Sequence, residues 1–407
     1  GRAAGPAGPR PGAAPARVLA AFVIIPAIVL AARARRRLKA VLLVGFAGYA
    51  VAALFLLHGA PDLALTQVLV ETITLVVMVL VLRRLPPYFS DRPLRASRWG
   101  RLVLASGVGL FAMFVAMVAP GARIHERVSV DFPHEAYTFG GGKNIVNVTL
   151  VDIRAWDTMG EISVLLVAAT GIASLIFLSR RSGEILRVAN APKDKVGAVW
   201  SANSVMDAST AMRIKDVANI AATASDAQLQ ETQRFRKWLS AGLTLAPQRR
   251  SVIFEVVARL LFHSIVVFAF FLLFTGHNQP GGGFAAGLVV GIALTIRYLA
   301  GGRYELGEAA PVHPGLLLGT GLFLSAGAGL VAILLGGEVL QSVIIQFTLP
   351  PFGEVKLVST LFFDIGVFLV VVGLVQDILL SLGAEIHKQG DTDDPEIGTY
   401  ARKESAL

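Results

Sequence analysis

The chain has 407 residues, of which 54% are hydrophobic and only 16% charged, and its mean hydropathy is +0.65. This composition excludes an ordinary soluble domain and is typical of a membrane protein. The net charge of +9 does not indicate a nucleic-acid-binding protein, because the basic residues lie beside apolar blocks and lack interleaved aromatic residues. The absence of cysteine excludes disulfides, thiolate metal sites, iron-sulfur ligation and thiol nucleophiles within this chain, and we expect no cofactor.

The N-terminal residues 1–16 are an Ala/Gly/Pro/Arg stretch with little capacity to pack, so we expect them to be disordered. The apolar block that follows, from Val18 to Ala32, is interpreted as a membrane helix and not as a signal peptide. Five basic residues follow it, and no small-residue cleavage site separates it from the next apolar block.

Apolar residues come in blocks of about 20, which at 1.5 Å rise per residue can cross a hydrocarbon core roughly 30 Å thick. They predict an all-α fold, a polytopic transmembrane helix bundle with nine spans. The expected spans are about 17–33, 39–57, 62–82, 101–119, 160–179, 251–275, 281–300, 314–336 and 358–381.

Basic clusters orient these spans, because cytoplasmic connections are enriched in Lys and Arg. Five basic residues between Arg33 and Lys39 place the first connection in the cytoplasm and the N-terminus outside. The second cytoplasmic connection carries six arginines: Arg83, Arg84, Arg92, Arg95, Arg98 and Arg101. The stretch from Arg180 to Arg250 has 12 Lys/Arg against 6 Asp/Glu, whereas residues 120–157 hold 4 Lys/Arg against 5 Asp/Glu, as an outside loop should. We therefore expect a multi-pass protein of the bacterial cell membrane, with its C-terminus in the cytoplasm.

The spans divide into two modules. Residues 17–182 form a five-helix module and residues 251–383 a four-helix module, joined by a polar cytoplasmic linker at 183–250. Residues 384–407 are an acidic cytoplasmic tail, which we expect to be disordered from Lys388 onward.

Glu71 is the first candidate for ion handling, because a charged group at membrane depth costs at least ~2.5 to 3.5 kcal/mol. Helical spacing places Gln67, Glu71 and Thr74 on one face of the third span. A buried carboxylate there can load and release a proton or desolvate a cation. The alternative is a paired carboxylate that holds helices together.

Two residues at the outer end of the same span are also candidates. Asp62 follows Pro61 where the helix begins, so an N-cap is the favoured interpretation, with an ion-path role as the alternative. His58 can serve as a proton entry group, although a lone interfacial histidine usually has no such role.

Three carboxylates precede or begin the fifth span. Asp152, Asp157 and Glu161 recur at spacings of five and four, so they can form a ladder that draws in Na⁺ or protons. Thr158 and Glu161 also fit a T-x-x-E capping box, which explains Glu161 without transport. Both interpretations remain open, and no residue set identifies a Na⁺ site.

The second module has its own charged residues. Glu255, Arg259 and His263 are spaced i, i+4, i+8 on one face of the sixth span, where an internal ion pair of the first two is favoured and His263 lies deeper. Asp364 lies among aliphatic residues of the ninth span, where an ion path and a buried structural pair are equally supported.

The stretch HNQPGGGF opens the seventh span. Asn278 or Gln279 can act near the helix cap, Pro280 suits the first helical turn, and the glycines allow tight turning or very close helix approach. Helix packing is the favoured interpretation of the whole set, which comprises His277, Asn278, Gln279, Pro280, Gly281, Gly282, Gly283 and Phe284.

Three stretches in this order resemble the Mrp-type (multiple resistance and pH) multisubunit Na⁺/H⁺ antiporter. The C-terminal, hydrogenase D-type region of its large A subunit is similar to LFLLHGAPDLALTQVLVETITLVVMVLVLRRLP, and the E-type region that follows is similar to NIVNVTLVDIRAWDTMGEISVLLVAATGI. The B subunit resembles GHNQPGGGFAAGLVVGIALTIRYLAGG together with LFFDIGVFLVVVG. The resemblance implies an A-tail fused to a B subunit. The family's antiporter-like N-terminal part has no counterpart here, so its transport residues are not carried over.

Three hypotheses about function follow. The first is a membrane subunit of an antiporter that exchanges cytoplasmic Na⁺ for external protons, a secondary transporter and not an enzyme. It would act with the complex's other membrane subunits in the lipid bilayer. The second is a membrane-arm subunit of a proton-translocating hydrogenase or complex I relative, and the third is a structural scaffold without an ion path of its own.

Overall fold

The computed structural model describes residues 14–82, 85–89, 95–119, 121–122, 124, 127–176, 252–350 and 353–392. The predicted linker at 183–250 lies outside the described residues, as do Arg83, Arg84, Arg92 and the tail from 393 onward. The described helices, turns and strands are α1 (Ala14–Arg33), α2 (Arg37–Leu57), α3 (Pro61–Leu82), α4 (Arg95–Val118), the 3₁₀ turn η2 (Val128–Val130), α5 (Phe132–Thr138), α6 (Ile145–Val148), the π-helical turn η3 (Thr149–Ile153), α7 (Ala155–Ile176), α10 (Val252–Thr275), α11 (Gly283–Ala309), α12 (Pro314–Leu334), β1 (Ile344–Leu349), β2 (Gly353–Val358) and α13 (Thr360–Thr392).

Each of the nine predicted spans coincides with a helix, which confirms the all-α polytopic class. Seven helices of the described residues are long and apolar enough to cross a membrane: α2, α3, α4, α10, α11, α12 and α13. The apolar stretch of α1, Val18–Arg33, is shorter, and α7 is not among the seven. The nine-span count therefore remains a prediction. The last helix continues to Thr392, so residues 388–392 of the expected disordered tail are helical.

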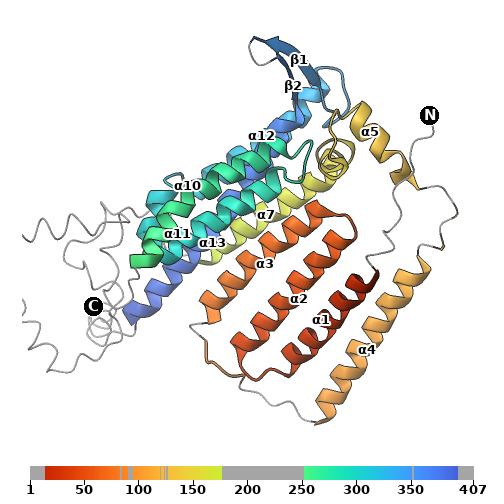
Figure 1. The fold of residues 1–407 in the computed structure, drawn as a ribbon. Coiled ribbons are helices and arrows are strands. Elements are labelled where there is room, and N and C mark those ends of the chain that lie inside the picture. The colour runs from red at the N-terminus through yellow and green to blue at the C-terminus, as the bar shows by residue number, and fades with distance from the viewer. Residues whose placement is uncertain are drawn as a thin grey trace, which may run out of the picture. The chain divides into compact units, whose positions relative to one another are not determined.

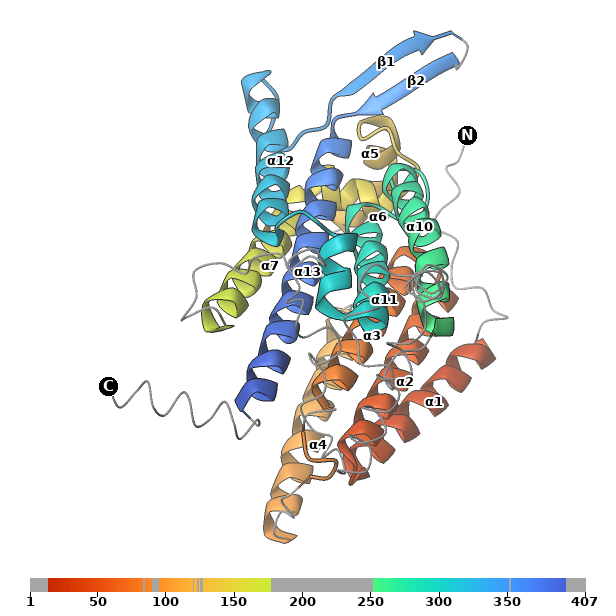
Figure 2. The same ribbon diagram turned by 90° about the vertical axis from the view of Figure 1, so that its left-hand side faces the viewer.

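The chain forms two compact units, one made of residues 1–153 with 277–280 and the other of residues 154–276 with 281–407. In the first unit α2 lies between α1 and α3 and packs on both (Figures 1 and 2). Helix α7, which was predicted in the five-helix module, packs on α13 and α12 of the second unit, and the bounds of the predicted modules remain a prediction.

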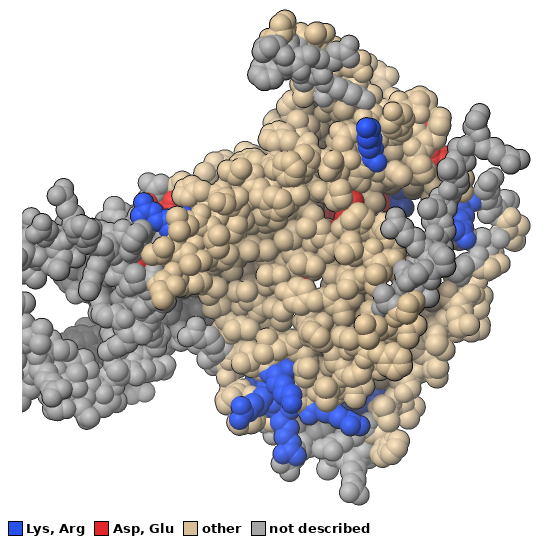
Figure 3. All heavy atoms as spheres, viewed as in Figure 1, with Lys and Arg blue, Asp and Glu red and all other residues tan. Residues whose placement is uncertain are grey.

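Two connections of the first unit that were predicted to lie on one side of the membrane meet there. Arg36 pairs with Tyr88 through a backbone bridge, and their side chains stack, with the guanidinium 5.5 Å from the ring centroid. Arg37 stacks in the same way on Phe89. Figure 3 shows Lys and Arg gathered near this end of α1 and α2, at the lower centre of the view. The contact supports the common side of the two connections.

The second unit is built around α13, which packs against α7, α10, α11 and α12. Figures 1 and 2 show α11 and α12 running beside α13. Its core includes the fully buried side chains of Phe363, Val367, Val370 and Val371. Apolar side chains on several faces of α13 are therefore covered by other helices, as expected for an interior membrane helix.

Glycines bring the helices of this unit into backbone contact. A Cβ atom added at Gly321 of α12 would lie 2.6 Å from the carbonyl oxygen of Gly366 and 2.8 Å from Val370 Cγ2. A Cβ at Gly287 of α11 would lie 2.7 Å from Val371 Cβ. Small residues at such crossings are the usual means by which membrane helices approach closely.

The antiparallel hairpin β1–β2 between α12 and α13 was not predicted. Its register pairs Ile344 with Val358 and Leu349 with Gly353. The segment alternates apolar and polar residues over a length too short for a span, a pattern typical of a strand that the hydropathy reading passed over.

The close crossing gives a stability prediction. Gly321→Ala will lower the unfolding midpoint of the detergent-purified protein, by about 1–3 kcal/mol of unfolding free energy, because the methyl group meets backbone that cannot move aside. Gly319→Ala, on the same helix with open space around its Cβ position, is the matched control and should be neutral or stabilising. Equal midpoints for the two variants would contradict the crossing.

Candidate functional site

The first unit contains a polar junction centred on Asn144, which is buried. Its side-chain Nδ2 donates to Asp62 Oδ1 at 3.1 Å and to the carbonyl oxygen of Gln279 at 2.9 Å. Its Oδ1 accepts from the backbone N–H of Asn147 and so caps α6. One amide thereby joins three segments far apart in sequence. We call the set of Asp62, residues 140–147 and residues 277–279 the Asn144 junction.

Backbone and histidine contacts complete the Asn144 junction. The Asn144 N–H donates to the carbonyl oxygen of His277 at 3.1 Å, and His277 Nε2 donates to the carbonyl oxygen of Gly140 at 2.9 Å. Asn278 Oδ1 accepts from the N–H of Lys143 at 3.3 Å. All three segments were predicted on the outer side of the membrane, and their contact supports that common side.

The expected caps of the seventh span are wrong. Helix α11 begins at Gly283, so Pro280 precedes the helix, and the side chain of Asn278 bonds to Lys143 instead. Gly281 and Gly282 have positive φ values of 158° and 94°, which confirms the tight turn. Phe284, the next residue of the motif, is half-buried in the first turn of α11. The motif thus divides between the units, its first four residues belonging to the first unit.

Asp364 has a structural partner. Its side chain is buried, and Oδ1 accepts from the N–H of Gly283 at 3.1 Å, the first residue of α11. A carboxylate from α13 therefore satisfies a helix N-terminus that has no cap from its own segment. This contact favours the structural interpretation of Asp364 over the ion path.

Glu71 lies half-buried against the backbone of α2. A Cβ at Gly48 would collide with the Glu71 carboxylate, so this glycine makes room for it. Gln67 Nε2 donates to Glu71 Oε2 at 3.5 Å, which is a long hydrogen bond, and no ion pair involves Glu71 among the residues that the structure describes. Thr74 is exposed, while Tyr49 and Thr72 join α2 to α3 through a 2.9 Å hydroxyl contact.

The predicted capping roles of Asp62 and of Thr158 with Glu161 are corrected. Helix α3 begins at Pro61, so Asp62 is its second residue and not the residue before it. Helix α7 begins at Ala155, so Thr158 lies inside the helix and cannot form the capping box with Glu161. His58 is exposed, with Nδ1 2.8 Å from the carbonyl oxygen of Leu54.

The three carboxylates at positions 152, 157 and 161 are divided between the two units. Asp152 belongs to η3 in the first unit, whereas Asp157 and Glu161 lie on α7 in the second, where both are exposed. Asp157 pairs with Arg154 at 2.5 Å. A continuous ladder through all three therefore remains a prediction, while Asp157 and Glu161 share one helix face.

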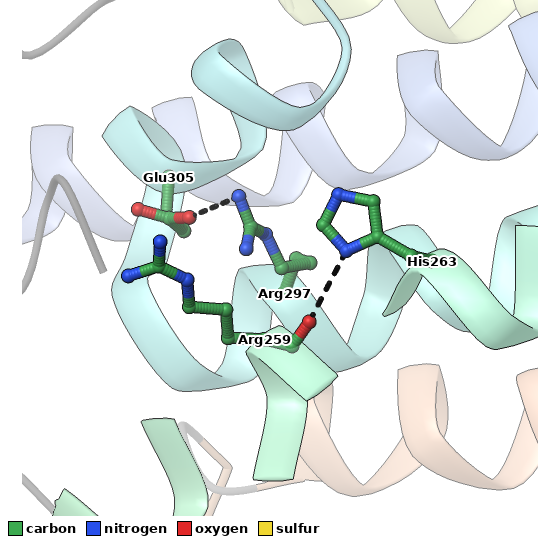
Figure 4. Close-up of polar contacts among 4 residues, drawn as sticks. All are labelled: Arg259, His263, Arg297 and Glu305. Atoms are coloured by element: carbon green, nitrogen blue, oxygen red, sulfur yellow. Dashed lines mark hydrogen bonds and ion pairs between the residues drawn. The ribbon is translucent and has the colours of Figure 1, made fainter. Parts of the chain in front are cut away.

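A buried ion pair that the sequence interpretation missed lies in the second unit. Arg297 Nη2 contacts Glu305 Oε1 at 2.5 Å, with 13% and 0% of the two side chains exposed. Helix α11 is kinked at Gly302, whose φ is 71°, and the kink brings position 305 back toward 297. Figure 4 shows Arg259 extending from α10 toward this pair.

The neighbouring residues of α10 place the other predicted charges. Glu255 is fully buried and Arg259 is exposed, and their mutual ion pair remains a prediction. His263 lies in the middle of α10 and its side chain is exposed, with Nδ1 3.4 Å from the carbonyl oxygen of Arg259, so its deeper position in the membrane remains a prediction. No group of three or more His, Cys, Asp or Glu side chains suited to a metal ion occurs within the described ranges.

Three family models match consecutive segments of the chain. Residues 22–87 match the family described as the D subunit of MBH, and residues 94–193 match the family described as the MBH E subunit. Residues 253–377 match a domain related to the MnhB subunit of a Na⁺/H⁺ antiporter.

Similar proteins give the same order. The chain is 32% identical over 354 residues to a probable K⁺/H⁺ antiporter A/B subunit of Rhizobium meliloti, covering 85% of this chain and 32% of that protein. It is 37% identical over 159 residues to the Na⁺/H⁺ antiporter A subunit of Bacillus subtilis, covering 39% of this chain and 20% of the relative. A chain in the structure of the Mrp complex from Dietzia sp. DQ12-45-1b is 30% identical, with a TM-score of 0.66, over 90% of this chain and 34% of that one. The chain thus spans at most about a third of these relatives.

The Asn144 junction predicts a local loss of stability. Asn144→Asp keeps the oxygen that caps α6, removes the donor to Asp62 and Gln279, and sets two carboxylates against each other. We expect hydrogen exchange of residues 140–148 to accelerate by the equivalent of about 1–3 kcal/mol, and Asp62→Asn in the same chain to restore part of the protection. Asn278→Asp, an exposed position whose acceptor is retained, is the control; an unchanged exchange rate in Asn144→Asp would refute the junction.

The buried ion pair makes a second prediction. Glu305→Gln leaves the Arg297 charge buried without compensation and should cost about 3–5 kcal/mol of unfolding free energy, measured as a lower unfolding midpoint in detergent. The paired change Arg297→Met with Glu305→Leu should recover most of that loss. Glu338→Gln, at an exposed position, controls for removal of a carboxylate. A double variant no more stable than Glu305→Gln argues against the pair.

Proposed function

Because the chain belongs to the Mrp-type multisubunit cation/proton antiporters, as the C-terminal region of an A subunit joined to a B subunit, we propose that it contributes carboxylates to an ion path. It acts as a membrane subunit of a secondary transporter, with other subunits of the complex as partners. The exchange is cytoplasmic Na⁺ for external H⁺. Relatives named for Na⁺ and for K⁺ make both cations substrates to be measured.

The observation that carries the proposal is the state of Glu71. It stands on a membrane helix with a single long hydrogen bond from Gln67 and without an ion-pair partner in the described part of the chain. A carboxylate with a purely structural role between helices would be expected in an ion pair, because an unpaired buried charge lowers the stability of the protein. An acceptor-only group with an uncommitted charge suits a proton or a monovalent cation.

Gly48 supports the same role, because its missing side chain leaves space in which the carboxylate rests against α2. A larger residue would displace the charged group and leave the rest of α3 in place. The glycine at position 48 therefore determines where the Glu71 carboxylate lies.

Glu161 is the second carboxylate of the proposed path. It lies on α7, exposed and without a hydrogen bond to any described residue. Asp157, one turn earlier, forms an ion pair with Arg154, whereas Glu161 has no ion-pair partner among the described residues. Glu161 is the one that remains free to exchange an ion.

The orientation of the proposed path follows the basic clusters. The N-terminus is outside, and the connection between α1 and α2 and the C-terminus are cytoplasmic, in a bacterial cell membrane. The Asn144 junction, His58 and Asp62 then face the outside, where protons enter. The alternative function is a subunit in the membrane arm of a redox-driven complex, because the first two segments match MBH subunit families. The MnhB-related second half favours the antiporter.

The test is transport by the whole complex in inverted vesicles. Glu71→Gln and Glu161→Gln should each reduce the pH change driven by Na⁺ or K⁺ by at least about tenfold, as removal of a group essential to proton transfer does. Assembly is checked by co-purification of the other subunits. Glu135→Gln, at a half-buried carboxylate of α5, is the matched control. Full transport by both assembled variants would leave the scaffold hypothesis standing and remove the ion path.

A further inference from the structure

Three neighbouring polar residues near the end of the membrane part of α13 are buried without use in the proposed path. Gln376, Asp377 and Ser381 have exposed fractions of 1%, 8% and 2%. Over the preceding turns the helix is aliphatic, with buried Val370, Val371 and Val375. We call the three residues the Asp377 cluster.

The Asp377 cluster presents oxygen atoms without donors. Asp377 Oδ2, Gln376 Oε1 and Ser381 Oγ are buried and have no hydrogen-bond partner among the described residues. Carboxylate and amide oxygens can only accept, so a further acceptor would not satisfy them. An unpaired buried carboxylate is costly, which points to a positive ligand.

Gln376 is held in one orientation. Its Nε2 donates to the carbonyl oxygens of Ala310 at 3.0 Å and Val312 at 2.8 Å, in the connection between α11 and α12. Since carbonyl oxygens accept only, the amide cannot flip without losing both bonds. The orientation of the amide is therefore fixed, and its oxygen is left as a buried acceptor.

His313 does not supply the missing partner of Asp377. His313 acts electrostatically on Asp377, but its Nδ1 accepts the N–H of Gly315 at 3.1 Å and caps α12. A doubly protonated ring would lose this cap. Because Nδ1 of His313 is occupied as an acceptor, it does not donate to Asp377, and the buried Asp377 oxygen stays open to a bound cation.

We propose that the Asp377 cluster is a binding site for one monovalent cation. Positions 377 and 381 lie one helical turn apart on one face, so the carboxylate and hydroxyl oxygens can reach the same ion. Oxygen ligands suit Na⁺ and K⁺, and one carboxylate balances a single charge. The site lies in the MnhB-related half and is separate from Glu71 and Glu161.

The test is local hydrogen exchange of the assembled complex in NaCl, KCl or choline chloride of equal ionic strength. Peptides covering residues 310–316 and 372–381 should exchange about tenfold more slowly when Na⁺ or K⁺ is at ten times its dissociation constant, because only the closed site binds. Asp377→Asn should abolish this slowing and Ser381→Ala should reduce it. Glu338→Gln should retain it.

Glu71→Gln should also retain the slowing, so that failure of the ion path and failure of this site give different results. Equal exchange of the wild type in the three salts would overturn the proposal. Slowing that persists in Asp377→Asn would overturn it as well. If Asp377→Asn does not assemble, Ser381→Ala decides, because an unchanged cation dependence in that variant refutes the site.

Discussion

Close backbone contact at glycines is the constraint on which the second unit depends. Lipid tails are as apolar as leucine, so membrane helices gain little from hiding apolar side chains and must gain from packing. Gly321 and Gly366 allow α12 to touch α13, and Gly283 allows the start of α11 to reach Asp364. The same approach lets Asp364 bond to the N–H of Gly283, so the packing and the cap depend on each other.

The helices could be predicted from sequence because the signal is local and strong. Apolar blocks of membrane length identify a span without knowledge of its neighbours, and all nine expected blocks are helical. The hairpin β1–β2 escaped because six-residue strands carry little signal beside such blocks. The place of α7 escaped for another reason: its partners, α12 and α13, lie more than 130 residues later in the chain.

The candidate sites divide in the same way. Gln67 and Glu71 are one turn apart, so helical spacing alone predicts their contact. Gly48 and Asn144 escaped, because a glycine that admits a carboxylate and an amide that joins three loops are known only through tertiary contacts. From residue types alone, HNQPGGGF could only be recognised as an unusual motif. The structure explains the glycine at position 282, because its φ is positive and other residues rarely adopt that conformation.

The kink at Gly302 bears on how the protein reaches the membrane. In a straight helix, positions 297 and 305 would be about 12 Å apart along the axis, too far for contact. The break closes that distance within one helix, so Arg297 and Glu305 can neutralise each other before α10, α12 or α13 has packed. Two separate charges would each oppose insertion by at least ~2.5 to 3.5 kcal/mol. Paired within one helix, Arg297 and Glu305 therefore oppose the insertion of α11 less than two separate charges would.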